Sequence, residues 1–586
     1  MRHIPNPRKI TPPFPSAVTM GYTLEPHLFR KPLMPDRISN RLLSRTGQLS
    51  VEMTTWPSVT GSNDEAAFSA RLLDLFAALP AFRDHPENVV AFDTHGDPAR
   101  RNVLALVRGK GRRCLVLAGH FDTVSIANYG TLIDLACDPE ALTEALIAEL
   151  SAKPRNPVED KALTDLLSGN FLAGRGLLDM KSGLAAGIAA LERFAGLDER
   201  PGNLLFVATP DEENRSRGMR ALRDHLPDIA EQFGLDIIGG INLDASGDDG
   251  DGEQGRAVYL GSVGKFSPFA FVAGRPTHAG YAYDGVSAHL ISAEIMRAME
   301  FNSALCDEAH GEISPPPVCL EAKDVRHGYE VTTPAHVWLS FNWLTHRRAP
   351  TDILEEFRAL VSNAMDTALQ AQAENARAFF ERQGSGRKID LHGQVLTYAD
   401  LRARVAQTVD GNTLARIEAL EASLATSDEP LSATRAVVSE MLTATGLEGP
   451  LAVIGFSTLH YPRVHVDDAG EVGNHFARRL EKAVKSIESR HATSIRFKQY
   501  FQGISDMSFF GHRPEAQQAG TLADNTPVPA FVDRPPQTAL AYPVVNIGPW
   551  GRDYHQKWER VHMPYAFEVM PDLIYECALA VLGDEA

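Results

Sequence analysis

Residues 114–124 read CLVLAGHFDTV, and this stretch decides the fold class. An uninterrupted apolar run that ends in polar residues is typical of a strand buried on both faces of a parallel sheet. Three later stretches have the same form: NLLFVATPDEE at 203–213, DIIGGINLDASGD at 236–248 and YPVVNIG at 542–548. Helical segments separate these runs, so the order of elements predicts an α/β domain in which helices cover a central sheet.

Residues with metal-binding side chains lie where these strands end. In open α/β sheets, sites gather outside the carboxyl ends of the strands. Each candidate has a simpler explanation by itself, such as a helix cap or a solvated strand end, but unrelated residues would be scattered over both ends of the sheet. Two His and three carboxylates form a mixed N/O set that suits zinc, with manganese or cobalt as alternatives. The five candidate ligands are His120, Asp179, Glu213, Asp244 and His555.

Two further acids lie beside these candidates. Asp122 follows His120 at a spacing of two, so both side chains point to the same side of the strand and the carboxylate can orient the imidazole. Glu212 and Glu213 are neighbours whose side chains point in different directions. One of the two can therefore bind metal while the other takes a proton from water, which favours metal-assisted hydrolysis.

The alternation of buried strands and helices breaks off near residue 263. A strand at 336–344 (HVWLSFNWL) and a helix at 353–365 indicate a smaller α+β domain inserted into the first. A further insertion, at 131–170, directly follows the first His-x-Asp motif. The expected divisions are an N-terminal extension (1–40), the first part of the main domain (41–262), the smaller domain (263–450) with an additional helical insertion (about 370–450), and the second part of the main domain (451–586).

Composition excludes several classes of protein. At 586 residues the chain is too long for one hydrophobic core. Its formal net charge of -18 argues against nucleic acid or an anionic membrane as the main partner. No stretch approaches about 20 consecutive apolar residues, so no membrane span is expected. Five scattered cysteines without a CxxC spacing indicate reduced thiols, and therefore a cytoplasmic location.

The series HFDTV, GRGLLDMKSG, PDEE, LDASGD and GRDYHQKWE, in this order, resembles the M20 family of dinuclear metallopeptidases and aminoacylases. The early stretch TTWPSVTGSNDEAAF is similar to the opening helix of that family. Chain length, the insertion after HFDTV and the TP–FNW pattern resemble the RocB-type arginine-utilisation branch in particular. The resemblance implies a zinc-exopeptidase-like α/β/α catalytic domain, interrupted by a ferredoxin-like α+β lid or dimerisation domain, and a homodimer.

The resemblance also implies a role for each motif residue. His120 and Asp244 would hold one metal ion, Glu213 and His555 the other, and Asp179 would bridge them. Glu212 would be the general base, Asp122 would orient His120, and the Asp179–Met180 peptide would be cis. In GRPTHAG (274–280), His278 would reach the site of a partner subunit and stabilise the developing oxyanion.

One stretch departs from the family pattern. Relatives that bind a substrate carboxylate often have an Asn before a Pro in the lid, where this chain has Glu330 nearby, so carboxypeptidase specificity is not implied. Arg347 and the GISDM loop (503–507) around Ser505 and Asp506 are candidate substrate contacts by their position alone.

Residues and resemblance together predict a hydrolase with two divalent metal ions, preferably Zn²⁺. Its substrate would be a small amino-acid derivative or dipeptide, cleaved at a peptide, N-acyl or ureido bond, and the RocB-type likeness adds arginine catabolism as the setting. Two alternatives stay open. One is a catalytically idle, metal-stabilised dimer that binds a ligand or a partner protein, and the other is an amidase with a single metal ion.

Overall fold

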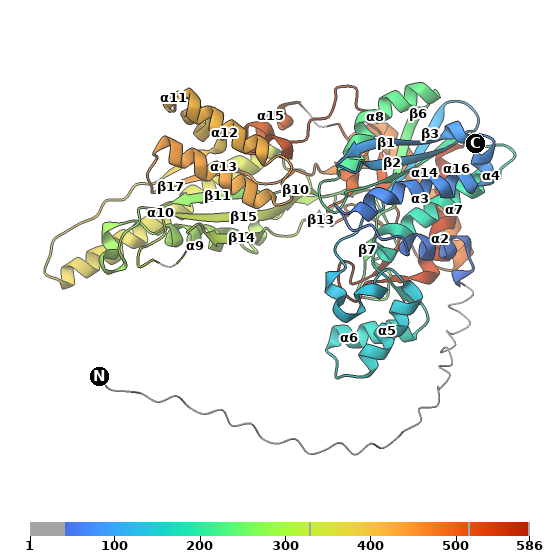
Figure 1. Cartoon of the computed structure of the whole chain (residues 1–586), viewed down its shortest axis with the longest axis horizontal. Coiled ribbons are helices and arrows are strands. Elements are labelled where there is room, and N and C mark those ends of the chain that lie inside the picture. The colour runs from blue at the N-terminus through green and yellow to red at the C-terminus, as the bar shows by residue number, and fades with distance from the viewer. Residues whose placement is uncertain (1–40, 327, 329, 514–515, 584–586) are drawn as a thin grey trace, which may run out of the picture.

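A computed structural model of the chain describes residues 41–326, 328, 330–513 and 516–583. The extension predicted at 1–40 lies outside the described residues. Figure 1 shows two lobes, joined near the middle of the molecule. Within the described ranges, no helix has the length and apolar character needed to cross a membrane.

The first lobe, which we call the catalytic lobe, is built on an eight-stranded sheet in the order β1-β2-β5-β3-β6-β20-β8-β19. Its four central strands run parallel: β5 (Asn203–Thr209), β3 (Arg113–His120), β6 (Asp236–Asn242) and β20 (Val544–Asn546). These are the four strands that the sequence predicts. The outer strands are β1 (Val89–His95), β2 (Arg100–Val107), β8 (Ala257–Tyr259) and β19 (Arg496–Lys498).

Helices cover both faces of this sheet. Along β3, Leu115 and Leu117 point into one core, whereas Cys114, Val116 and Ala118 point into the other, which is the period of two that a strand imposes. The predicted α/β/α arrangement is therefore confirmed. The first core contains α2 (Arg45–Thr54), α3 (Asn63–Ala78), α7 (Ser182–Ala195), α14 (Gly470–His491) and α16 (Met570–Leu582), and the second contains α8 (Arg217–Phe233).

The second lobe, which we call the lid, is inserted between β9 (Gly261–Ser262) and β18 (Val464–His465), two short strands that pair with each other. Its sheet has six strands, in the order β10-β15-β11-β17-β16 with β14 beside β15. In Figure 1 the lid extends to the left of the catalytic lobe. The strands are β10 (Gly264–Phe266), β11 (Pro268–Ala273), β14 (Val318–Asp324), β15 (His336–Thr345), β16 (Gln394–Thr397) and β17 (Leu451–Phe456).

Helices also cover both faces of the lid sheet. Along β11, Ala270 and Val272 point toward α9 and α10, whereas Phe269 and Phe271 point toward α11, α12 and α13. A ferredoxin-like domain carries its helices on one face, so the predicted helical insertion supplies a second layer. The bounds are α9 (Ala288–Met299), α10 (Pro350–Arg382), α11 (Tyr398–Thr408), α12 (Gly411–Ser423) and α13 (Pro430–Thr445).

The domain boundary predicted at residue 451 is too early. β17 (Leu451–Phe456) pairs with β11 and β16, so it is a lid strand. Its sequence, LAVIGF, is a short apolar run, and such a run does not tell which of two sheets will bury it. α15 (Ala516–Asn525), much later in the chain, also packs on the lid beside α10 and α11.

The insertion predicted at 131–170 forms an arm on the catalytic lobe. It consists of the 3₁₀ helix η2 (Ala127–Leu135), α5 (Pro139–Ser151) and α6 (Pro157–Leu167). In Figure 1 the two α-helices lie side by side below the lobe. The arm returns through β4 (Phe171–Ala173), which leads directly into the Gly-rich loop of the candidate metal site.

Candidate metal centre and active site

Three neighbouring strands bring the first candidate ligands together. His120 ends β3, Glu213 follows β5, and Asp244 follows β6. These strands are adjacent and parallel, so their carboxyl ends meet at one edge of the sheet. Asp179 reaches the same edge from the loop before α7, and His555 reaches it from the last part of the chain.

The five side chains form two groups that share one carboxylate. His120, Asp179 and Asp244 form one group, and the second consists of Asp179, Glu213 and His555; within each group the potential ligand atoms lie within 4.8 Å of one another. Asp179 Oδ1 is 3.3 Å from His120 Nε2, and Asp179 Oδ2 is 3.1 Å from His555 Nε2. Glu213 Oε1 is also 3.1 Å from His555 Nε2. The two oxygens of Asp179 therefore face different groups, as a bridging carboxylate requires.

The donor atoms fit divalent cations. His120 Nε2, Asp179 Oδ1 and Glu213 Oε1 are buried and have no hydrogen-bond partner. Buried polar atoms are normally paired, so three orphans at one point need an explanation. Burial raises the pKa of Glu213, because its charged form is poorly solvated there. Two cations would supply the missing partners and offset the repulsion among the carboxylates.

Asn546 fixes the backbone of Asp244. Its Oδ1 accepts a hydrogen bond from Asp244 N at 3.0 Å, and its Nδ2 donates to Asp244 O at 2.8 Å. Asn546 ends β20, the strand beside β6, and is buried. Asn546 was not singled out from the sequence, although an amide side chain inside the otherwise apolar run VVNIG was an available sign.

The loop of Asp179 is packed tightly against β3. Its peptide bond to Met180 is cis, as the resemblance implied. Met180 Sδ lies 3.3 Å from the backbone N of His120. Gly119 leaves room for this side chain, because a Cβ there would lie 2.2 Å from Met180 Cε.

Asp122 binds the Glu212–Glu213 backbone more closely than it binds His120. Its Oδ1 accepts from Glu212 N at 3.0 Å, while Oδ2 accepts from Glu213 N at 3.2 Å and from Thr60 Oγ1 at 2.8 Å. His120 Nδ1 is 3.6 Å from the same carboxylate and 3.1 Å from the backbone O of Asp122. The carboxylate therefore positions the turn that carries both glutamates.

Glu212 belongs to neither ligand group. Its Oε2 lies 3.8 Å from His120 Nε2, and its side chain is only 9% exposed. Burial raises the pKa of Glu212 well above its usual range; His120 opposes this rise and the charge of Asp244 adds to it. A carboxyl group that holds a proton readily, beside a metal centre, suits general acid–base chemistry.

A cavity of about 290 Å³ opens onto both ligand groups. It is large enough for a small amino-acid derivative. A second cavity, of about 500 Å³, shares Phe501, Gly503 and Tyr554 with the first. Gly503 and Ile504 belong to the GISDM loop that the sequence offers as a substrate contact. The lining side chains that were not singled out from the sequence are Asn214, Ala245, Lys265, Tyr461, Phe501 and Tyr554.

Two other predicted site residues, His278 and Arg347, lie outside this lining. His278 is in the lid, where its Nδ1 accepts a hydrogen bond from Gly280 N at 3.1 Å. Arg347 is 70% exposed, lies 3.4 Å from Asp307 Oδ1, and lines a different cavity between the lobes. Arg347 is not among the described residues that line the metal cavity, so its predicted substrate contact stays a prediction.

Asp506 and Ser505 are enclosed in the protein and do not reach the cavity surface. The side chain of Asp506 is buried, and its Oδ2 accepts from Thr209 Oγ1 at 3.2 Å. Burial raises its pKa to about 7. Ser505 Oγ accepts from Asn242 Nδ2 at 3.0 Å. Neither residue is among the described residues that line the cavity, so their predicted substrate contact stays a prediction.

The arm reaches the metal centre through the backbone of His555. Asn128 Nδ2 donates to His555 O at 3.0 Å, and Arg175 donates to the same oxygen at 3.4 Å. His555 has a φ of 65°, the left-handed region that is costly for a side chain other than glycine. The two hydrogen bonds help to hold this ligand in its strained conformation.

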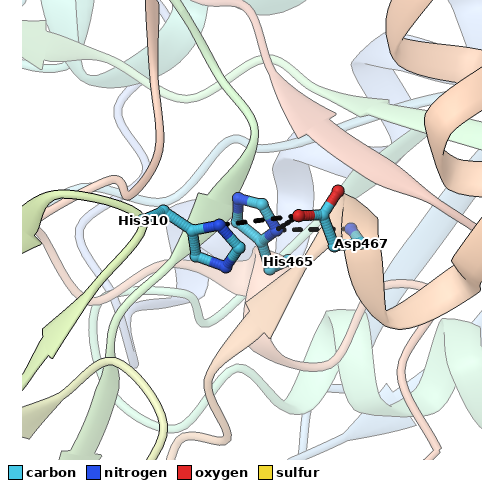
Figure 2. A group of neighbouring side chains, drawn as sticks. All are labelled: His310, His465 and Asp467. Carbon is cyan, nitrogen blue, oxygen red and sulfur yellow. Dashed lines mark hydrogen bonds and ion pairs between the residues drawn. The ribbon is translucent and has the colours of Figure 1, made fainter.

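A third group of potential ligands does not fit a metal ion. Figure 2 shows His310 and His465 stacked beside Asp467; the ring centroids are 4.0 Å apart and the planes differ by 17°. A nitrogen lone pair lies in the plane of its ring, so two stacked rings cannot both aim one at an ion about 2 Å away. His465 Nδ1 also accepts from Asp467 N at 3.2 Å, and its Nε2 lies 3.2 Å from Gln499 Oε1.

Comparison with known proteins agrees with this geometry. The family model described as peptidase family M20/M25/M40 matches residues 159–522. The uncharacterized protein YqjN of Bacillus subtilis is 30% identical over 533 residues, which cover 90% of this chain and 94% of YqjN. Protein RocB of the same organism is 27% identical over 560 residues, which cover 92% of this chain and 95% of RocB.

Among solved structures, a tripeptidase from Staphylococcus aureus matches with a TM-score of 0.50 at 16% identity, covering 92% of this chain and 98% of the tripeptidase. This match supports the fold. The resemblance predicted from the order of the motifs is thus confirmed: the chain belongs to the peptidase family M20/M25/M40 and is a hydrolase of that family.

Proposed function

We propose that the chain is a two-metal hydrolase that cleaves an amide-type bond in a small amino-acid derivative. The observation that carries the proposal is the carboxylate of Asp179, whose two oxygens face His120 and His555 from opposite sides. Asp244 would complete the site of His120, and Glu213 that of His555. The mixed N/O set favours zinc, with manganese or cobalt as alternatives.

Glu212 performs the proton transfers in this proposal. When bound, the two cations would polarise the scissile carbonyl and lower the pKa of the attacking water. Glu212 takes a proton from that water, because among the described carboxylates that line the cavity it is the one that belongs to neither ligand group. It then delivers the proton to the leaving nitrogen. Asp122 keeps the backbone of Glu212 in place during both steps.

Replacing Glu212 by Gln tests this assignment. The variant should keep both metal ions and lose turnover by roughly 10²- to 10⁴-fold, because only the base is removed. Metal per chain is measured by elemental analysis, and turnover on acylated amino acids, ureido acids and dipeptides with added zinc, manganese or cobalt. Glu213→Gln is the matched control and should lose metal.

Three results would contradict the assignment. Metal loss from folded Glu212→Gln would make Glu212 a ligand. One metal ion per wild-type chain would favour the mononuclear alternative. No turnover by the metal-loaded wild type on the whole panel would favour the idle binding protein.

We propose arginine catabolism in the cytoplasm as the setting. The extended similarity to protein RocB supports the pathway. All five cysteines are free, which fits a reducing compartment.

His278 is proposed to act on a second copy of the chain. Within its own chain it does not line the cavity, so a homodimer would have to bring it to the site. Mixing inactive His278→Ala with inactive Glu212→Gln tests this role. Exchange of subunits should restore activity, because one site of the mixed dimer then has both groups; failure of two exchanging variants to complement would show that His278 does not act in trans.

A further inference from the structure

Lys265 contributes a positive charge to a cavity lined by acids. Among the described residues that line the metal cavity, it is the sole lysine or arginine, whereas four of the others are carboxylates. It lies in β10, the first strand of the lid, directly after the chain leaves the catalytic lobe. Lys265 is not part of any motif of the series, so it was not singled out from the sequence.

The chain passes between the lobes at two segments, one around Lys265 and one around Tyr461, which we call the hinge. The backbone of Lys265 is fixed there. Its N donates to Tyr461 O at 2.8 Å, and Tyr461 N donates to Lys265 O at 3.2 Å. Tyr461 belongs to the segment by which the chain returns from the lid. The ammonium group lies over the Tyr461 ring, 5.2 Å from its centroid. Both segments of the hinge therefore position the Lys265 side chain at the wall of the cavity.

The ammonium group has no carboxylate partner. Among the described residues, no carboxylate oxygen lies within 4.0 Å of its Nζ, the limit for an ion pair. Burial lowers the pKa of Lys265, and the charge of nearby Glu212 opposes this. A largely buried cation without a counter-charge is destabilising, and such groups are concentrated at functional sites.

We propose that Lys265 binds the carboxylate of the substrate, so that the enzyme acts on acyl amino acids or short peptides whose free carboxylate lies beside the cleaved amide. This inference rests on the proposed function and names its substrate class. An anion that enters an acid-lined cavity is repelled by Glu212 and by any charge that the metals leave uncompensated. Lys265 offsets this repulsion at one wall.

The position of Lys265 favours a substrate carboxylate over the reacting oxygen. The reacting carbonyl must lie at the ligand groups, whose carboxylate oxygens are all more than 4.0 Å from Nζ. In an acyl amino acid or peptide the carboxylate carbon is three bonds from that carbonyl carbon, through the amide nitrogen and the Cα, and can span the gap. Phe501, Ile504 and Tyr554 provide apolar surface in the same cavity for the rest of the substrate.

Lys265→Met tests the inference, because Met keeps the length and removes the charge. Each substrate is compared with its carboxamide, which differs only in lacking the negative charge. For the acid we expect kcat/KM to fall about 10- to 100-fold, mainly through KM, the effect of losing one charge-assisted hydrogen bond. For the carboxamide we expect a change below about threefold.

Two control variants distinguish the effect of losing the charge of Lys265 from the effect of misfolding. Lys265→Arg should recover part of the preference for the acid. Lys110→Met removes an exposed lysine that lies 3.6 Å from Glu199 and should match the wild type. Thermal unfolding checks that each variant is folded.

An equal loss on acid and carboxamide would overturn the inference, because it would place Lys265 at the reacting oxygen. No loss on either would also overturn it. If the wild type cleaves neither, the proposed function fails while Lys265 remains testable. Calorimetric binding of the free amino acid to zinc-loaded protein should then weaken in Lys265→Met, and unchanged binding would refute the carboxylate role.

Discussion

Asp122→Asn distinguishes two roles of one carboxylate. The sequence predicts that Asp122 orients His120, whereas the structure shows it accepting hydrogen bonds from the backbone of Glu212 and Glu213. Asn has nearly the same shape, but one of its two terminal groups is a donor. The amide oxygen can replace Oδ2, which accepts from Glu213 N and Thr60 Oγ1. The NH₂ group then faces the N–H of Glu212 across 3.0 Å.

The expected losses of stability and of kcat follow from these two donors facing each other. One hydrogen bond to a charged acceptor is lost, about 1.5–3 kcal/mol, and the N–H of Glu212 is left buried without an acceptor. The turn relieves this by moving, and the base moves with it. A displacement of about 1 Å at the reacting groups costs roughly 10²-fold in rate. We therefore expect kcat to fall about 10²-fold while both metal ions stay bound at saturating zinc.

Steady-state kinetics and elemental analysis at several zinc concentrations measure both quantities. Thr60→Val is the matched control: it removes one donor to Oδ2 and leaves the Glu212 contact intact, so kcat should change by only a few-fold. Recovery of full kcat by Asp122→Asn in excess zinc would refute the reasoning, since the carboxylate would then act only through His120 and metal affinity.

Three further variants or treatments have defined outcomes. Asn128→Ala removes the 3.0 Å hydrogen bond to His555 O, so a chelator should release one ion about tenfold more easily than the other; simultaneous release of both would contradict this. Gly119→Ala places a Cβ 2.2 Å from Met180 Cε, which should cost about 1–3 kcal/mol and lower the Tm by a few degrees; an unchanged Tm would show that Met180 moves freely. Removing metal should lower the Tm, and zinc at 100 to 1,000 times its Kd should restore roughly 3–4 kcal/mol; a Tm indifferent to zinc would argue against a metal centre.

The ligand set could be predicted from the sequence because its geometry is local. His120, Glu213 and Asp244 each lie at or just after the carboxyl end of a buried strand, and parallel neighbouring strands bring such positions to one edge of the sheet. The lid boundary could not be predicted in this way, since LAVIGF at 451–456 is equally suitable for either sheet. Lys265 could not be predicted either, because it becomes part of the site only when the segments around Lys265 and Tyr461, which are distant in the sequence, pair in the folded chain.

The two walls of the cavity come from different parts of the fold. One wall carries the metal ligands and the base, and the other carries the proposed substrate contact. The ligands and Glu212 come from the catalytic lobe, whose sheet edge is held by Asp122 and Asn546. Lys265 and Tyr461 come from the hinge, where reciprocal backbone hydrogen bonds join them. Because the hinge contributes no ligand, substitutions there should change KM and selectivity and leave the metal content intact. Substitutions at the strand ends should change kcat or metal content. A hinge variant that lost metal would show that the lid also supports the ligands, and this division would then fail.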